Sequence, residues 1–181
     1  GNDTVSGAAL TKPLFVWAGD GNDVITSGSA ADVLFGGAGN DVLSGSGGND
    51  ELTGSEGDDS LLGGGGNDTY WFTADTALGL DLLNESGGGI DTLNFTSTSI
   101  GLSLDLAIAD SQQVNEHISL ILGAGTTFEN VVGGSSADFL RGNASTNTLD
   151  GRAGNDVLEG RGASDDLDGD DEGPSGCDSS D

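Results

Sequence analysis

Aspartate side chains at a fixed nine-residue spacing are the groups in this sequence best placed to do chemistry. A nonapeptide can be read without an insertion in six copies over residues 18–71. The sixth position of every copy is Asp: Asp23, Asp32, Asp41, Asp50, Asp59 and Asp68. Because Asp is short, its oxygens can converge with the backbone carbonyls of a turn into the shell that a hard cation prefers. The spacing therefore indicates a series of cation sites.

The same period returns nearer the C-terminus. Four copies over residues 133–168 place Asp138, Asn147, Asp156 and Asp165 at the sixth position, and a single copy over residues 86–94 places Asp91 there. Asn147 brings one neutral oxygen in place of a carboxylate. We therefore expect weaker cation binding at the edge that it shares with Asp165.

The composition also points to cations, and it excludes several classes of protein. The chain has 31 acidic and 4 basic residues and a formal net charge of -27. Nucleic-acid binding needs a basic surface, so it is excluded as a main activity, and adsorption to an anionic membrane is disfavoured for the same reason. No apolar run is long enough to span a bilayer. The one Cys cannot make an internal disulfide.

The period also predicts the elements that position these carboxylates. Positions one to six read as a glycine-rich turn, and positions seven to nine as a short strand whose middle, apolar side chain points inward. Two nonapeptides then make one coil of 18 residues, so that strands of successive coils pair in parallel. The first-block carboxylates fall into two columns, Asp23, Asp41 and Asp59 on one edge and Asp32, Asp50 and Asp68 on the other.

Columns of like charge at the strand spacing of about 4.8 Å repel one another unless cations lie between them. Ca²⁺ suits such a column because it accepts carboxylate and carbonyl oxygens in irregular geometry, whereas Mg²⁺ demands a small octahedral shell. Zn²⁺ and copper prefer His or Cys ligands, which this chain lacks in number.

The copies GGAGNDVLS from Gly36 and GGGGNDTYW from Gly63 resemble the repeats-in-toxin (RTX) family, whose signature is GGxGxDxUx with U a large apolar residue. The resemblance implies an all-β fold, a right-handed parallel β-roll or β-helix solenoid with Ca²⁺ between stacked turns. It implies roughly six Ca²⁺ ions, counted from the turns that can bracket one. The implied metal ligands are the carboxylates and the amide at position six together with turn carbonyls: Asp23, Asp32, Asp41, Asp50, Asp59, Asp68, Asp91, Asp138, Asn147, Asp156, Asp165, Gly36, Ala38, Gly45, Gly47, Gly54, Gly63 and Gly65.

The repeats divide the chain into five parts. We expect a degenerate N-terminal repeat or cap over residues 1–17, a first repeat block over 18–71, irregular β rungs that continue the solenoid over 72–132, a second block over 133–168 and a disordered acidic tail over 169–181. The alternative for residues 72–132 is a separate small β-domain. Because the sequence starts in mid-repeat, we also expect it to be a piece of a longer protein.

No catalytic site is expected, since His117 and Cys177 stand alone and neither a GxSxG nor a HExxH pattern occurs. The aromatic residues cluster at the two ends of the first block, where we expect them to plug and cap the core: Phe15, Trp17, Tyr70, Trp71 and Phe72. Exposed aromatic rings could instead stack on sugars.

Two functions follow. The resemblance implies a non-catalytic calcium-binding structural module of a secreted or cell-surface bacterial protein, which leaves the cell unfolded by type I secretion and folds on binding extracellular Ca²⁺. The alternative is an accessory module of a secreted enzyme of the protease, lipase or alginate epimerase type, with polysaccharide contact. Calcium and neighbouring modules of the same chain are the expected partners.

Overall fold

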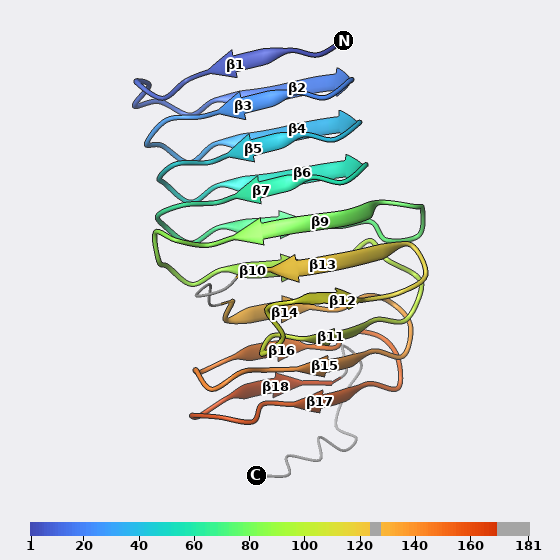
Figure 1. The fold of residues 1–181 in the computed structure, drawn as a ribbon. Helices are drawn as coiled ribbons and strands as arrows, with labels where there is room; N and C mark the ends of the chain where they lie inside the picture. Colours follow the sequence, from blue (N-terminus) through green and yellow to red (C-terminus); the bar gives the residue numbers. More distant parts are fainter. Residues whose placement is uncertain (124–127, 170–181) are drawn as a thin grey trace.

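Short strands separated by glycine-rich turns stack along one axis, from the N-terminus at the top of Figure 1 to the last strand at the bottom. The computed structural model describes residues 1–123 and 128–169. Over these residues it contains no helix, and therefore none that could span a membrane. The expected all-β parallel solenoid is confirmed.

The strands form three sheets. The seven-stranded sheet holds, in spatial order, β1 (Thr4–Ser6), β3 (Val24–Thr26), β5 (Val42–Ser44), β7 (Ser60–Leu62), β9 (Gly79–Asn84), β13 (Ile118–Leu122) and β12 (Ser111–Gln113). The eight-stranded sheet holds β2 (Phe15–Asp20), β4 (Val33–Ala38), β6 (Glu51–Glu56), β8 (Thr69–Trp71), β10 (Thr92–Asn94), β14 (Asn130–Val132), β16 (Thr148–Asp150) and β18 (Asp166–Asp168). The third sheet holds β11 (Ser103–Asp105), β15 (Phe139–Arg141) and β17 (Val157–Glu159).

The register shows that two nonapeptides make one coil. In the seven-stranded sheet Ile25 lies beside Leu43, and in the eight-stranded sheet Leu34 lies beside Leu52. Each partner is two repeats further along the sequence. The 18-residue coil read from the period is therefore the stacking unit.

The core is a single column of apolar side chains between the sheets. Every position-eight residue of the first block has a relative exposure of 0%: Ile25, Leu34, Leu43, Leu52, Leu61 and Tyr70. Burying a Leu stabilises the fold by about 1.5–3 kcal/mol. With only one such side chain per short strand, the apolar core is thin.

Glycine at the second repeat position has a conformational role. Gly37 has φ 117°, in the left-handed region, and a Cβ atom there would lie 2.0 Å from the carbonyl oxygen of Gly19 in the coil above. Both the backbone conformation and the close approach of the two coils therefore require glycine at this position.

The two larger sheets continue through β9, β10, β12, β13 and β14 of the expected irregular segment, whereas β11 starts the third sheet. β10 lies between β8 and β14, with Leu93 beside Tyr70 on one side and Val131 on the other. β13 pairs in parallel with β9, and β12 pairs antiparallel with β13. Spatial order thus departs from chain order here, because β13 returns next to β9 after β11 has started the third sheet (Figure 1).

The aromatic residues do not all plug the core as expected. Tyr70 and Phe72 are buried, with Phe72 stacked on Phe95 at a centroid distance of 4.9 Å. Phe15 and Trp17 are 67% and 72% exposed, so the expectation of buried caps is wrong for these two. The physical reason is strand alternation: Val16 occupies the inward position of β2, and its two neighbours point outward.

Residues 1–17 hold β1 and the start of β2, with Thr4 beside Val24 and Phe15 beside Val33. Of the acidic tail expected over residues 169–181, all but Gly169 lies outside the described residues.

Candidate metal centre

Each position-six carboxylate joins two coils. In the first column, the N–H of Asp23 donates to Oδ1 of Asp41 over 2.8 Å, and the N–H of Asp41 donates to Oδ1 of Asp59 over 2.8 Å. The second column repeats the arrangement, with bonds of 2.8 Å from Asp32 to Asp50 and from Asp50 to Asp68. The predicted columns therefore exist, and one oxygen of each acid is used to hold the coil before it.

The other carboxylate oxygen is where a cation would bind. Within the described part of the chain, Oδ2 is buried without a hydrogen-bond partner in Asp23, Asp41, Asp50, Asp59, Asp68 and Asp91. All six residues are at most 2% exposed. A buried carboxylate oxygen left unpaired costs several kcal/mol, so such atoms normally have a partner.

In the four copies that begin with glycine, this oxygen points at that glycine. A Cβ atom at Gly36 would lie 2.2 Å from Oδ2 of Asp41, and one at Gly54 would lie 2.1 Å from Oδ2 of Asp59. The arrangement is the same at Gly45 and Asp50. The absence of a side chain at position one therefore keeps the carboxylate close to the turn backbone, where carbonyl ligands are available.

The predicted carbonyl ligands lie in these turns and already accept some hydrogen bonds. The carbonyl of Ala38 accepts the N–H of Gly21 over 2.8 Å, and that of Gly65 accepts the N–H of Gly48 over 2.7 Å. A carbonyl oxygen has two lone pairs, so each keeps one for a cation. Gly47 and Gly65 also form an isolated parallel bridge between two coils.

Most of the turns fall into two classes according to the backbone at position two; the turn of Asp91 belongs to neither, because Gly87 is not left-handed and Oδ2 of Asp91 is still without a partner among the described residues. A left-handed position two precedes carboxylates with a partnerless oxygen: Gly37 (φ 117°) before Asp41, Ser46 (68°) before Asp50, Ser55 (82°) before Asp59 and Gly64 (103°) before Asp68. In three other turns position two is not left-handed, and its N–H bonds the position-six side chain instead. These bonds run from Gly28 to Oδ2 of Asp32 (3.1 Å), from Gly134 to Oδ2 of Asp138 (2.8 Å) and from Asn143 to Oδ1 of Asn147 (2.8 Å).

Asn147 belongs to the second class of turn, and its expected role as a cation ligand stays a prediction. Its Oδ1 accepts the N–H of Asn143, while its Nδ2 donates to the carbonyl of Glu129 over 3.1 Å. Its backbone N–H still donates to Oδ1 of Asp165 over 2.9 Å, as in the other columns. An amide at this position therefore bonds both the turn N–H and the Glu129 carbonyl, and it removes one carboxylate charge from the column.

Burial raises the pKa values of several column acids, Asp41, Asp50, Asp59, Asp68 and Asp91 among them, and neighbouring carboxylates raise some of them further. The pKa of Asp50 rises to about 7 and that of Asp59 to about 6, mainly through burial. Neutralising side chains are scarce, because the sequence has no Lys or Arg between Lys12 and Arg141. Cations bound between the coils would compensate the charge that the columns keep at neutral pH.

The sequence reading missed three acids that the structure adds to this system. Oδ1 of Asp81 accepts the N–H of Asp59 over 3.0 Å and extends the first column, with its pKa raised by burial to about 8. Glu129 extends the second column by accepting the N–H of Asp91 over 2.9 Å. Glu85, in the loop after β9, lies close to Asp68 and Asp91.

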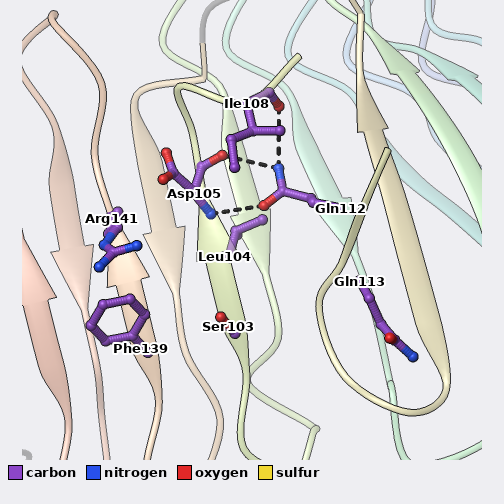
Figure 2. Close-up of a pocket in the computed structure, with 8 residues that line it drawn as sticks. All are labelled: Ser103, Leu104, Asp105, Ile108, Gln112, Gln113, Phe139 and Arg141. Carbon is purple, nitrogen blue, oxygen red and sulfur yellow. Dashed lines mark hydrogen bonds between the residues drawn. The ribbon is translucent and has the colours of Figure 1, made fainter. Parts of the chain in front are cut away.

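A shallow hollow of about 210 Å³ lies between β11, β12 and β15, away from the carboxylate columns (Figure 2). Its polar groups bind one another: Gln112 accepts the N–H of Asp105 over 2.9 Å and donates from Nε2 to the Asp105 carbonyl over 2.9 Å. The Asp105 carboxylate also forms a two-bonded ion pair with Arg161. These contacts tie the irregular segment to the second block, and none of the predicted metal ligands lines the hollow.

His117 is not part of the columns. The His117 ring is 3.6 Å from the carboxylate of the exposed Glu116. Cys177 lies outside the described residues.

Comparison with known families supports the assignment made from the repeats. Four copies of the RTX calcium-binding nonapeptide repeat match residues 15–43, 44–76, 124–158 and 141–172, more than half of the chain. A search of curated proteins gives no match. The repeat match, the parallel solenoid and the carboxylate columns agree, and the chain belongs to the family of RTX calcium-binding nonapeptide-repeat proteins.

Proposed function

We propose that this chain is a non-catalytic structural module of a secreted or cell-surface bacterial protein, and that it folds when it binds Ca²⁺ outside the cell. The observation that carries the proposal is the set of buried Oδ2 atoms that lack partners among the described residues, in a stretch of sequence without Lys or Arg. Hard oxygen donors of this kind, combined with turn carbonyls, fit Ca²⁺.

The two classes of turn divide the proposed ligands. The carboxylates with a partnerless Oδ2, such as Asp41, Asp50 and Asp59, hold ions together with the carbonyls of position-one and position-three residues. Asp32, Asp138 and Asn147 close their turns with a position-two N–H instead and contribute little. This division favours fewer ions than the number of nonapeptide copies.

Binding and folding are coupled in this proposal. The metal-free chain combines many glycines to order, a thin core and a net charge of -27, all of which oppose compaction. Each ion contributes two positive charges and crosslinks adjacent turns of the folded state only, so it stabilises that state by mass action. Low calcium inside the cell then keeps the chain unfolded for export, and high calcium outside folds it.

A calcium titration tests the coupling. Far-UV circular dichroism and light scattering should show a cooperative change from an expanded coil to compact β-structure with Ca²⁺, reversed by a chelator. An equal titration with Mg²⁺ should produce little change. A chain that is already compact and β-rich in chelator would contradict the proposal.

A matched pair of substitutions tests which turns bind ions. Asp50→Asn and Asp32→Asn change the same group in the same column, at residues that are both 1% exposed. The first replaces a partnerless oxygen and the second replaces one bonded to Gly28. Equilibrium dialysis should find fewer bound ions per folded chain for Asp50→Asn only. Equal losses in the two variants would contradict the division of the turns.

The alternative function, an accessory module of a secreted enzyme that contacts polysaccharide, is favoured by one observation. The rings of Phe15, Trp17 and Phe35 form an outward-facing strip on β2 and β4, with Trp17 stacked on Phe35 at a centroid distance of 5.6 Å. Flat exposed rings of this kind suit stacking on sugars. The acidic charge of the chain favours neutral over anionic polysaccharides.

Binding of the calcium-loaded protein to a panel of insoluble neutral polysaccharides tests this alternative. Trp17→Ala should abolish retention without changing the calcium titration, because Trp17 lies outside the core. Retention that is absent in the parent protein, or unchanged in the variant, would count against it.

A further inference from the structure

The junction between the first repeat block and the irregular segment holds an acidic cluster unlike the regular turns. Carboxylate oxygens of Asp68, Glu85 and Asp91 lie within 4.8 Å of one another, and all three residues are at most 5% exposed. Asp68 and Asp91 belong to the repeat pattern, but Glu85 comes from the loop between β9 and β10 (Figure 1).

Two oxygens in this cluster are buried without hydrogen-bond partners among the described residues. Oδ1 of Asp68 accepts the N–H of Asp50, and Oδ1 of Asp91 accepts the N–H of Asp68, each over 2.8 Å. Oδ2 of both residues has no partner. These two atoms favour a bound cation, because a buried carboxylate oxygen without a hydrogen-bond partner is energetically costly. They are an observation separate from the clustering of the three acids.

Glu85 stands where the regular turns have a backbone carbonyl. A Cβ atom at Gly45 would meet Oδ2 of Asp50 at 2.3 Å and the carbonyl oxygen of Gly63 in the next coil at 2.7 Å. At Gly63 the corresponding neighbours are Oδ2 of Asp68 at 2.4 Å and Oε1 of Glu85 at 2.2 Å. A carboxylate has thus replaced a neutral ligand, and it faces the same point as Oδ2 of Asp68.

Tyr70 holds Glu85 in this position. It occupies position eight, where the preceding five copies have Ile or Leu, and its hydroxyl donates to Oε1 of Glu85. The N–H of Gly63 donates to the Tyr70 oxygen over 2.7 Å, and the N–H of Gly64 donates to Oε2 of Glu85 over 3.3 Å. Tyr70 is the only tyrosine of the sequence, and it lies in the copy whose turn donates the Gly64 N–H to Glu85.

We propose that Asp68, Glu85 and Asp91 form a three-carboxylate Ca²⁺ site that closes the lower end of the first block and binds more tightly than the sites of the regular turns. The inference rests on the proposed calcium-dependent folding and adds to it an off-repeat ligand, Glu85, with Tyr70 as its positioning residue. Affinity for Ca²⁺ rises with the number of charged ligands in a rigid site. Burial also raises the pKa of Glu85, to about 8, as expected for an acid that lacks a positive neighbour.

Equilibrium dialysis with Ca²⁺ alone tests the site in the full chain. Glu85→Gln should bind about one ion fewer per chain at the low Ca²⁺ concentrations at which the parent protein fills its tightest site, and that site should fill only at a Ca²⁺ concentration about tenfold higher. Glu51→Gln is the matched control, since Glu51 lies in the same block, is exposed and occupies position seven, outside the proposed ligands. Circular dichroism at saturating Ca²⁺ reports whether each variant is folded.

A second variant keeps the test decisive if Glu85→Gln does not fold. Gly63→Ala keeps every charge but places a methyl group between Asp68 and Glu85, at a position that does not need the left-handed conformation. It should lose the same ion. Glu85→Gln and Gly63→Ala curves that both superimpose on that of Glu51→Gln would overturn the three-carboxylate site. A parent protein that binds no Ca²⁺ would instead overturn the proposed function itself.

Discussion

Truncation of one core leucine should shift the calcium dependence of folding by a predictable amount. Leu43 in β5 is 0% exposed and packs inside the single column of the core, whereas its neighbour Val42 is 41% exposed. Leu43→Ala should cost about 3 kcal/mol, within the range for a fully buried leucine that leaves a cavity. Val42→Ala should cost less than about 1 kcal/mol, because it removes an exposed strand side chain.

Because ion binding and folding are coupled, each loss of folding free energy shifts the Ca²⁺ concentration at the midpoint of folding. If about four ions bind with the folding of the first block, 3 kcal/mol is about 0.75 kcal/mol per ion, a rise of about three- to fourfold in the Ca²⁺ midpoint. The same division gives at most about a 1.5-fold rise for Val42→Ala. Neither substitution touches a proposed ligand, so the amplitude at saturating Ca²⁺ should stay the same.

The assay is a circular dichroism titration of the parent protein and both variants with Ca²⁺ under one set of buffer conditions. Equal midpoints for Leu43→Ala and the parent would refute the coupling between core packing and ion binding. Equal shifts for the two variants would refute the assignment of the inward face.

Three further outcomes are expected. Gly54→Ala should raise the Ca²⁺ midpoint, because its methyl group would collide with the Asp59 carboxylate at 2.1 Å. Gly47→Ala should shift the midpoint little, because the nearest neighbour of its methyl group is 3.7 Å away. The same titration compares the two variants, and equal shifts would contradict the proposed ion position. In metal-free buffer, acid pH should favour the folded form, because burial raises the pKa values of Asp50, Asp59 and Asp81 to about 7, 6 and 8, above the ordinary value of 3.8. The stabilisation from their protonation is fully present below about pH 4 and is lost as the pH rises through 6 to 8, so circular dichroism should show less β-structure at pH 8 than at pH 5, and a pH-independent spectrum would count against it. Ser55→Gly should stabilise the calcium-loaded fold by about 0.5–1 kcal/mol in thermal unfolding, because Ser55 has φ 82°, whereas a Gly replacement at Ser60, inside β7, should destabilise it.

The repeat period was sufficient to predict the regular coils. Apolar residues at position eight fixed which side chains face inward, and the 18-residue offset fixed the partner of each strand, as Ile25 and Leu43 show. The carboxylate columns follow from the same offset. This success has a simple cause, because each coil of a solenoid contacts only its neighbours and long-range structure repeats local structure.

The coils that change length could not be placed in this way. Gly79, Asp81 and Leu83 keep the spacing of positions four, six and eight, but Asp81 pairs with Asp59 at an offset of 22 residues, so a reading at fixed period passes over it. Glu85 and Glu129 carry no periodic signal, since they reach the columns from loops. The return of β13 to the side of β9 depends on pairing between distant short strands, which no local pattern specifies.

The aromatic residues at the start of the first block illustrate a different limit. Alternation around Val16 was enough to place Phe15 and Trp17 outside, but their apolar character suggested a cap. Local geometry decided their orientation here, and hydrophobicity did not.

The hydrogen bonds along the carboxylate columns make the two ends of the solenoid unequal. Each coil donates its N–H to the acid of the coil that follows in the sequence, as Asp23 does to Asp41 and Asn147 does to Asp165. Removal of residues 1–17 would leave extra acceptor oxygens on Asp23 and Asp32, which water can satisfy. Removal of residues beyond 160 would strip the acceptor from the buried Asn147 N–H, at a cost of about 1–3 kcal/mol. The columns therefore have a direction: shortening from the C-terminus removes the acceptors of their N–H groups, whereas shortening from the N-terminus removes the donors to their carboxylates.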